Sequence, residues 1–290
     1  MSSTFSPAVW QDHRLEWGAR TYVMGIVNVT PDSFSGDGLV VDTLADDVWV
    51  QQAVMQAKKF VAEGAVFIDV GGESTRPGAP SVSTEQELAR VIPVIKVLRE
   101  VLPAEVMISI DTYKAEVAEQ ALTAGACIIN DIWALRADPA MAKVIAAHGV
   151  PVILMANMRG YQKREIISDV VRFLAGSMDM ALAAGVAWEH IIIDPGIGFG
   201  TTPEESLTLL RRLGELRVLG RPVLLGTSRK SSIGRVLGGL PASERLEGTA
   251  ATVALGIAQG ADIVRVHDVH EMMRVVKMSD AVVRGTFQLS

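Results

Sequence analysis

Three acidic or amide residues, Asp111, Asn130 and Asp194, each stand at or next to the end of a short apolar segment. Burying such a side chain without a partner costs a few kcal/mol, so each of them is expected to meet a polar group. A carboxylate can accept two parallel N–H hydrogen bonds from one flat group. Together these residue types fit a ring rich in N–H donors, such as the 2-amino-4-oxo edge of a pyrimidine. Taken singly, each could instead be a helix cap or a loop anchor.

A second group, Lys230, Arg265 and His267, is basic and follows the last two apolar segments of the chain. Lysine and arginine neutralise anionic oxygens, and arginine can bind two oxygens at once. This group therefore predicts a site for phosphate. The alternative is that Arg265 and His267 form ion pairs with Asp268 or Glu271.

Other candidate motifs carry less weight. The run Gly196–Gly200 lacks the G-x-G-x-x-G spacing and the distant acidic partner of a dinucleotide site, and Gly226–Ser231 lacks the glycine spacing of a phosphate loop. The few histidines form no zinc motif. The single cysteine, Cys127, excludes a disulfide framework and a cysteine-cluster metal site, and its apolar surroundings predict a buried thiol.

The elements that must position these residues are eight short apolar segments with little alternation of polar and apolar residues. Such runs are typical of strands buried on both faces, as in parallel sheets. The predicted strands are Tyr22–Val29, Val66–Gly71, Val106–Asp111, Cys127–Ile132, Pro151–Met155, His190–Asp194, Pro222–Gly226 and Ile263–His267.

Helical patterns separate these strands. Capping-box sequences at Ser83–Gln86 and Thr202–Glu205 predict two helix starts, and Asp138-Pro139 predicts a third. The stretch Ser231–Gly260 has room for two helices. Eight strand–helix units predict a (β/α)8 TIM barrel, with the doubly wound open sheet as the competing architecture. We expect residues 1–20 to form an N-terminal extension, with a floor-closing hairpin within Trp10–Arg20, and residues 21–285 to form the barrel.

A TIM barrel places its chemistry at the C-terminal ends of its strands and often binds phosphate after the last two. Both groups of candidate residues fall at these positions. The loops after the first two strands, Thr30–Gly38 and Gly71–Gly78, are rich in glycine, proline and serine and carry Phe34 and Arg76. They are candidate lids over a substrate, or else ordinary surface turns.

Composition limits the remaining possibilities. The chain has 290 residues, 49% hydrophobic, and 27 Lys and Arg against 33 Asp and Glu give a net charge of −6. So much apolar surface excludes disorder, and the acidic balance argues against a nucleic-acid partner. The longest uncharged run, Val144–Met158, contains a proline and is too short to span a membrane. Because Met1–Arg14 has no signal-peptide core, we expect a cytoplasmic protein without a membrane partner.

Several of these segments resemble the signatures of the dihydropteroate synthase family. The resemblance covers about residues 14–285 and is most specific in its first two motifs. Its motifs are Met24–Ser35, Asp69–Gly78, Ser109–Thr112, Ile129–Asp131, Asp194–Phe199, Ser228–Ser231, Arg245–Thr249 and Arg265–Val269.

The resemblance implies a barrel, a homodimer, and a reaction. In that reaction 6-hydroxymethyl-7,8-dihydropterin diphosphate and 4-aminobenzoate give 7,8-dihydropteroate and pyrophosphate with Mg²⁺, a step of folate biosynthesis. It assigns catalytic roles to Asp111, Lys230, Arg265 and His267. By motif position, the resemblance implies that the pterin contacts Asp111, Asn130, Asp194 and Lys230. The diphosphate would contact Asn28, Arg265 and His267, with Asn28 also a Mg²⁺ ligand. The aminobenzoate would contact Phe34, Thr75, Arg76, Pro77, Phe199 and Ser228, and Met155 and Gly226 would make further substrate contacts.

Two positions depart from the family pattern. The chain has Met155-Ala156-Asn157-Met158 where Met-His-Met is frequent, and Ala134 where glycine is common. Two alternative functions stay open. One is a pterin-dependent methyltransferase acting on a corrinoid protein, which would not need the Asn28 loop or the Arg265/His267 anion site. The other is a non-catalytic pterin-binding paralogue, against which Arg76, Lys230 and Arg265 argue.

Overall fold

Eight parallel strands form the centre of the computed structural model, which describes residues 5–30, 46–74 and 80–287. They pair in the order β8-β7-β6-β5-β4-β3-β10-β9, and an isolated parallel bridge between Ile193 and Val223 joins the two ends of this order. The prediction of a (β/α)8 barrel is confirmed. The strands are β3 (Tyr22–Asn28), β4 (Phe67–Gly71), β5 (Met107–Asp111), β6 (Ile128–Asp131), β7 (Val152–Met155), β8 (Ile191–Asp194), β9 (Leu224–Leu225) and β10 (Ile263–Val266).

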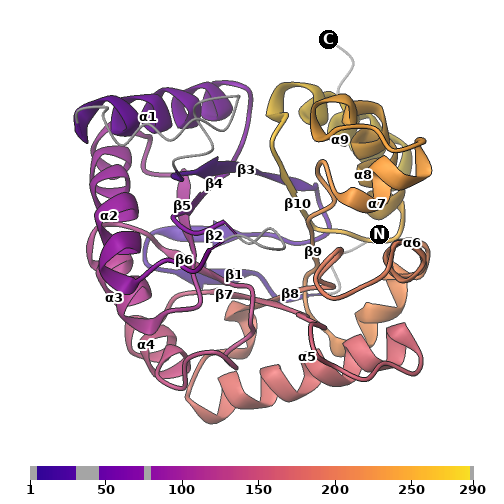
Figure 1. Ribbon diagram of the computed structural model, residues 1–290, viewed down its shortest axis with the longest axis horizontal. Helices are drawn as coiled ribbons and strands as arrows, with labels where there is room; N and C mark the ends of the chain where they lie inside the picture. Colours follow the sequence, from indigo (N-terminus) through magenta and orange to yellow (C-terminus); the bar gives the residue numbers. More distant parts are fainter. Residues whose placement is uncertain (1–4, 31–45, 75–79, 288–290) are drawn as a thin grey trace.

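Helices surround this barrel on the outside (Figure 1). Two of them, α7 and α8, lie between β9 and β10, which confirms the prediction of an extra helix in Ser231–Gly260. The helices are α1 (Asp46–Ala62), α2 (Thr84–Val101), α3 (Ala115–Thr123), α4 (Met141–His148), α5 (Ile166–Ala183), α6 (Pro203–Arg211), α7 (Ser231–Val236), α8 (Leu246–Ala258) and α9 (Val269–Arg284), with short 3-10 helices at Trp188–His190, Leu213–Leu219 and Ala242–Glu244.

The two predicted capping boxes are present at the starts of α2 and α6, where Ser83 and Thr202 accept from the backbone N–H three residues later. The third predicted start is displaced, because α4 begins at Met141 rather than at Asp138. One carboxylate oxygen of Asp138 accepts from Ala140 N at 2.9 Å, and the other accepts from Ala115 N, also at 2.9 Å. Asp138 therefore holds the turn before α4 and joins it to the first residue of α3.

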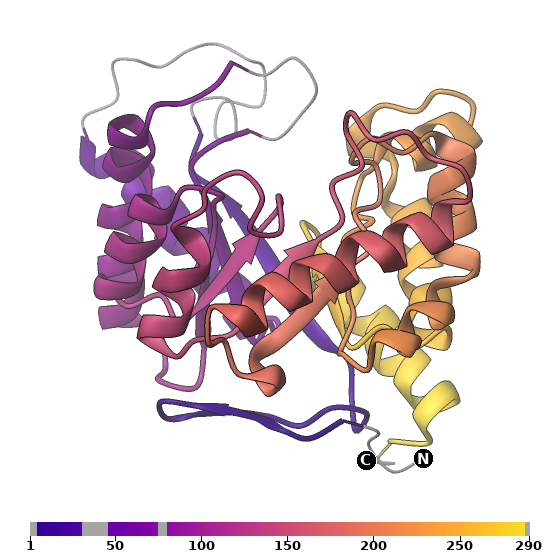
Figure 2. The same ribbon diagram turned by 90° about the horizontal axis from the view of Figure 1, so that it is seen from below.

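The N-terminal hairpin is present, but it begins before the predicted segment Trp10–Arg20. It pairs β1 (Ala8–Trp10) with β2 (His13–Leu15). The hairpin lies across the floor of the barrel (Figure 2). Trp10 donates its indole N–H to the carbonyl of Cys127, which precedes β6, at 3.0 Å. The hairpin thus closes the end of the barrel opposite the strand C-termini.

The strands are buried along nearly their whole length, as their apolar sequences predict. The strand predicted over Pro222–Gly226 is shorter in the structure, where only Leu224 and Leu225 form β9. Among the described helices none is long and apolar enough to cross a membrane.

Candidate active site

Four residues at the C-terminal ends of neighbouring strands stand in one row across the sheet. Asn28 of β3 is in register with Gly71 of β4, Gly71 with Asp111 of β5, and Asp111 with Asn130 of β6. Register partners in parallel strands point to the same side of the sheet. The glycine leaves space between its neighbours, since a Cβ atom there would lie 3.5 Å from Asp111 Cβ and 3.8 Å from Asn28 Oδ1. The row brings Asn28, Asp111 and Asn130 to one end of the barrel.

Arg265 of β10 joins this row to a second carboxylate beneath it. Its Nη2 donates to Asp111 Oδ2 at 2.8 Å, and its Nε donates to Asp69 Oδ2 at 2.6 Å. The same Asp69 oxygen accepts from Asn130 Nδ2 at 3.1 Å. Asp69 is fully buried on β4, two residues before Gly71, so it faces the same side of the sheet as that glycine. The guanidinium group of Arg265 therefore links Asp69, deeper in the barrel, to Asp111 at the end of its strand.

The two rim carboxyls, on Asp111 and Asp194, are less acidic than usual. Burial raises the pKa of Asp111 to about 7, against the opposing attraction of Arg265 and with a further contribution from Asp69. Burial also raises the pKa of Asp194 to about 6, although Gly196 N–H donates to Asp194 Oδ1 at 2.7 Å. Both groups therefore titrate near neutral pH in the unliganded protein.

Lys230 lies between these carboxyls and an aromatic ring. Its Nζ is 4.2 Å from the ring centroid of Phe199, a cation–π distance. Burial, together with repulsion from Arg265, lowers the pKa of Lys230 to about 8, while Asp194 and Asp111 act in the opposite direction. Lys230 thus lies within electrostatic reach of both carboxyls.

His267 is held as a neutral ring. Burial and the charge of Arg265 lower its pKa to about 3. Its Nδ1 lies 2.9 Å from Ser228 Oγ, and that oxygen also accepts from the His267 backbone N–H at 3.2 Å. When the serine hydroxyl donates to Nδ1, the ring proton lies on Nε2. The predicted alternative, ion pairs of Arg265 or His267 with Asp268 or Glu271, does not occur among the described residues. Arg265 pairs with Asp69 and Asp111, and Asp268 pairs with Arg229.

A small apolar cluster lies beside these polar groups, separate from the main core. It consists of Ile132, Met155 and Phe199, with Tyr113 and Trp133 packed against it. Met155 ends β7 in register with Asp194. Apolar and aromatic side chains next to convergent hydrogen-bonding groups are typical of a site for a flat small molecule.

Asp131, which follows Asn130, anchors the loop after β6 instead of joining the site. Its carboxylate accepts from the backbone N–H groups of Trp133 at 2.8 Å and Leu135 at 2.7 Å. These bonds hold Ala134 and Leu135 in the left-handed region, at φ 50° and 69°. This conformation favours glycine, so Ala134 adopts it at a conformational cost.

The structure brings the predicted residues of the described ranges to one end of the barrel. Gly226, after β9, is close to Asp194, since a Cβ atom there would lie 3.9 Å from Asp194 Oδ2. Four predicted residues lie outside the described residues: Phe34, Thr75, Arg76 and Pro77. Those within them are Asn28, Asp111, Asn130, Met155, Asp194, Phe199, Gly226, Ser228, Lys230, Arg265 and His267.

The sequence prediction assigned no role to Asp69, although its partners place it within the site. The signal was available, because a carboxylate inside a buried apolar strand requires a partner. Its sequence position gave no indication that this partner would be Arg265, which is 196 residues away.

No cluster of three or more His, Cys, Asp or Glu side chains in the described part of the chain could form a protein-only metal site. A magnesium ion does not need one, because it commonly keeps several waters and binds through one or two protein oxygens plus substrate phosphates. The amide oxygen of Asn28, placed beside Asp111, fits such a ligand set.

The chain is similar to known proteins over most of its length. A model of the pterin binding enzyme family matches residues 24–267. Dihydropteroate synthase of Bacillus subtilis is 51% identical, over 92% of this chain and 90% of the relative. That of Clostridium beijerinckii is 50% identical, over 92% and 96%.

Solved structures give the same result. A dihydropteroate synthase from Clostridium difficile, crystallised in the presence of pteroic acid, superposes with a TM-score of 0.87 at 50% identity and covers 93% of this chain and 99% of its own. An enzyme from Xanthomonas albilineans with 4-aminobenzoic acid gives 0.85 at 42% identity, over 93% and 95%. The family model, the relatives and the fold agree, and the chain belongs to the dihydropteroate synthase family of pterin-binding enzymes.

Proposed function

We infer that the chain is a transferase of folate biosynthesis that joins 6-hydroxymethyl-7,8-dihydropterin diphosphate to 4-aminobenzoate, giving 7,8-dihydropteroate and pyrophosphate. Relatives at about 50% identity over nearly the whole chain are dihydropteroate synthases. The structural observation that carries this inference is the convergence of Asp111 and Asn130 on Asp69 and Arg265, with Asp194 and Lys230 within electrostatic reach.

The pterin is proposed to bind by its donor-rich edge. Asp194 and Asn130 would hold the amino and ring N–H groups, and the apolar cluster of Ile132, Met155 and Phe199 would pack against the ring. A carboxylate that accepts two N–H bonds from one planar group is selective in geometry. Lys230, above the ring of Phe199, would donate to an oxygen or nitrogen acceptor of the pterin.

Bond breaking then follows from the charges around the methylene carbon. The C–O bond to the diphosphate breaks with its electron pair going to oxygen, and the electron-rich ring delocalises the positive charge that develops. Asp111, as the ionised carboxylate, is proposed to stabilise this charge. Arg265 and the Nε2–H of His267 are proposed to stabilise the negative charge on the departing diphosphate.

A magnesium ion is proposed to be held by Asn28 together with the diphosphate oxygens. When bound, it would neutralise charge on the leaving group. The contribution of the chain is to fix Asn28 beside Asp111, so that the diphosphate lies next to the carbon that loses it.

The incoming amine needs positioning more than a strong base. Its nitrogen lone pair forms the C–N bond, and the nitrogen then loses a proton. We propose that Ser228 and Phe199 form part of the aminobenzoate region, together with Phe34, Thr75, Arg76 and Pro77. No covalent intermediate with the protein is required.

The direct test is to incubate the protein with pterin diphosphate, 4-aminobenzoate and Mg²⁺. Equal amounts of pyrophosphate and 7,8-dihydropteroate are expected, measured by a coupled phosphate assay and by mass spectrometry. Omitting the aminobenzoate is expected to abolish the coupled product. Absence of dihydropteroate with all three components present would reject the proposal.

We also propose that the protein is a cytoplasmic homodimer. In support, helices α8 and α9 pack against each other and carry large apolar side chains that face solvent, among them Leu255, Met278 and Val282, at 59%, 65% and 72% exposure. Analytical ultracentrifugation is expected to give twice the chain mass of 31.1 kDa, and Val282→Glu is expected to give the chain mass itself. A monomeric wild-type protein would reject the dimer.

A further inference from the structure

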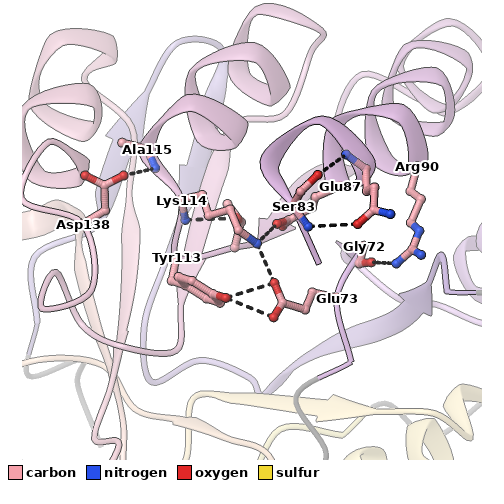
Figure 3. A network of polar contacts seen from close by, with 11 residues as sticks. Gly72, Glu73, Ser83, Glu87, Arg90, Tyr113, Lys114, Ala115 and Asp138 are labelled. Carbon is pink, nitrogen blue, oxygen red and sulfur yellow. Dashed lines mark hydrogen bonds and ion pairs between the residues drawn. The ribbon is translucent and has the colours of Figure 1, made fainter. Parts of the chain in front are cut away.

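A buried ion-pair network lies beside the site, and the chemistry described above does not use it. Lys114, the residue before α3, donates from Nζ to Glu73 Oε2 and to Glu87 Oε2, each at 2.5 Å (Figure 3). Its side chain is 16% exposed, and those of Glu73 and Glu87 are 13% and 1% exposed. Although burial disfavours its charge, these two carboxylates raise the pKa of Lys114. One ammonium group thus holds two carboxylates from different elements.

The network reaches the apolar cluster of the site through Tyr113. The tyrosine hydroxyl lies 3.0 Å from both carboxylate oxygens of Glu73, and its ring packs edge-on against Trp133 at 6.4 Å between centroids. Tyr113 and Trp133 in turn pack against Met155 and Phe199. A change at Glu73 therefore has a contact path to the cluster that contains Phe199, a residue of the proposed aminobenzoate region.

The segment that carries Glu73 is also fixed to helix α2. Arg90 donates to the carbonyl of Gly72 at 2.8 Å. A Cβ atom on Gly72 would lie 2.8 Å from Val91 Cγ1 and 3.0 Å from Glu87 Cγ, so only glycine fits this close approach. Gly72 therefore packs closely against α2, and Glu73 forms an ion pair with Lys114, shortly after the end of β5.

These contacts join the chain that follows β4 to the chain that follows β5. Tyr113 and Lys114 come two and three residues after Asp111, and Glu73 comes two residues before Thr75 and three before Arg76. We propose that Tyr113, Lys114, Glu73 and Glu87 form a positioning network, which holds the pterin-binding end of β5 relative to Phe199 of the proposed aminobenzoate region. This proposal rests on the proposed function.

The test separates the two substrates. Lys114→Met is expected to raise the KM for 4-aminobenzoate about tenfold, while kcat changes less, since binding of the second substrate is lost in ground and transition state alike. The Kd of 6-hydroxymethyl-7,8-dihydropterin, which lacks the leaving group, is expected to stay within about twofold by calorimetry. Tyr113→Phe keeps the ring and removes only the hydroxyl, so a smaller change in the same direction is expected.

Arg99→Met is the matched control for a general loss of stability. Arg99 holds the opposite end of α2 by donating to the carbonyls of Leu102, Pro103 and Val106. This variant is expected to lower the melting temperature without changing either substrate constant. In the double variant with Glu73→Gln, the effect of Lys114→Met is expected to be less than additive, as for two members of one network.

The outcomes distinguish this proposal from the proposed function. A wild-type protein that makes no dihydropteroate would refute both. An active wild type with an unchanged aminobenzoate KM in folded Lys114→Met and Tyr113→Phe would refute the positioning network alone. So would a pterin Kd that shifts as much as the aminobenzoate KM, because the network would then support the site only in general.

Discussion

At the scale of single residues, the site is a set of buried, mutually interacting charges. Arg265 pairs with Asp69 and Asp111, and Lys230 interacts with Asp194 and Asp111. Attraction between opposite charges is strong where water is excluded. An ionised Asp111 next to the reacting carbon would favour a transition state in which the pterin becomes positive.

Asp69 should matter for pterin binding although it lies below the rim. Asp69→Asn removes the charge that holds Arg265 and weakens the bond from Asn130, so pterin affinity is expected to fall by about 1–3 kcal/mol. The affinity can be measured by calorimetry with 6-hydroxymethyl-7,8-dihydropterin. Ser109→Ala is the matched control, because Ser109 is in register with Asp69 and its hydroxyl has no hydrogen-bond partner among the described residues. Equal losses in the two variants would contradict the role of Asp69.

Pterin binding should depend on pH through the two rim carboxyls. Because the pKa of Asp111 is raised to about 7 and that of Asp194 to about 6, both are largely protonated at pH 5 and ionised at pH 8. Affinity for the diphosphate-free pterin is therefore expected to rise with pH across this interval. The raised pKa also means that the fold loses stability as the pH rises from about 4, where the carboxyl ionises in the unfolded chain, to about 7, where Asp111 ionises in the fold.

The same calorimetric titration in Asp111→Asn should show a weaker pH dependence, limited to the interval where Asp194 ionises. Identical pH profiles for the wild type and the variant would show that Asp111 does not titrate in this range.

At the scale of elements, the loop after β8 depends on backbone that packs against backbone. Gly196 has φ 71°, and a Cβ atom there would lie 1.9 Å from the carbonyl oxygen of Ala156 in the loop after β7. This accounts for the glycines of Gly196–Gly200 without a dinucleotide. Close approach of the two loops holds Asp194 next to the end of β7.

Gly196→Ala should therefore destabilise the protein by more than about 3 kcal/mol, because main chain must move to admit the methyl group. Gly149→Ala is the comparison, since Gly149 has a similar φ of 61° but no atom within 4 Å of the added carbon. Only the cost of the left-handed conformation, about 1–2 kcal/mol, is expected there. Urea unfolding measures both, and equal midpoints would rule out the close approach.

The positions of helices and strands were predictable where burial of apolar side chains determines them, and less so where pairing between strands determines them. The eight strands coincide with apolar runs, and the capping boxes mark the starts of α2 and α6. The predicted strand Pro222–Gly226 is longer than β9, because a strand end requires a partner that the apolar run does not specify. The hairpin begins at Ala8 for the same reason, since its register follows from the pairing of Ala8 with Leu15.

At the scale of the whole molecule, some contacts that stabilise the barrel lie at the end opposite the candidate active site. The side chains of Asp280 and Arg284, at the end of α9, are 7% and 9% exposed and form an ion pair at 2.8 Å. Asp280 also accepts from the backbone N–H and the hydroxyl of Thr21, just before β3. These contacts join the two ends of the barrel sequence at the floor, away from the strand ends that carry the site.

Arg284→Met should consequently lower stability by about 2–4 kcal/mol, because it leaves a buried carboxylate unpaired. The kcat of the folded protein is expected to stay unchanged. Arg172→Met, which removes an ion pair of an arginine that is 76% exposed, is expected to cost less than about 1 kcal/mol. Thermal unfolding and steady-state assays separate the two effects. A large fall in kcat for Arg284→Met at a temperature where it is folded would contradict the separation.

The convergence of these strand-end residues could be predicted from the sequence, but the pairing between them could not. Strand-end position identified Asp111, Asn130 and Asp194, because parallel strands end at one mouth. The ion pair of Arg265 with Asp111 crosses 154 positions of the chain, and no local pattern encodes it. Expecting Arg265 to serve the diphosphate alone overlooked that it also neutralises the carboxylates of the pterin region.

The central claim is that Asp111 stabilises the positive charge that develops as the diphosphate leaves. Single-turnover measurement of pyrophosphate release, with both substrates and Mg²⁺ saturating, compares Asp111→Asn with the wild type at pH 8, where Asp111 is ionised. The rate is expected to fall about 100-fold or more, with the Kd for 6-hydroxymethyl-7,8-dihydropterin changed much less. Equal rates in the two proteins would contradict the account, as would a loss confined to pterin binding.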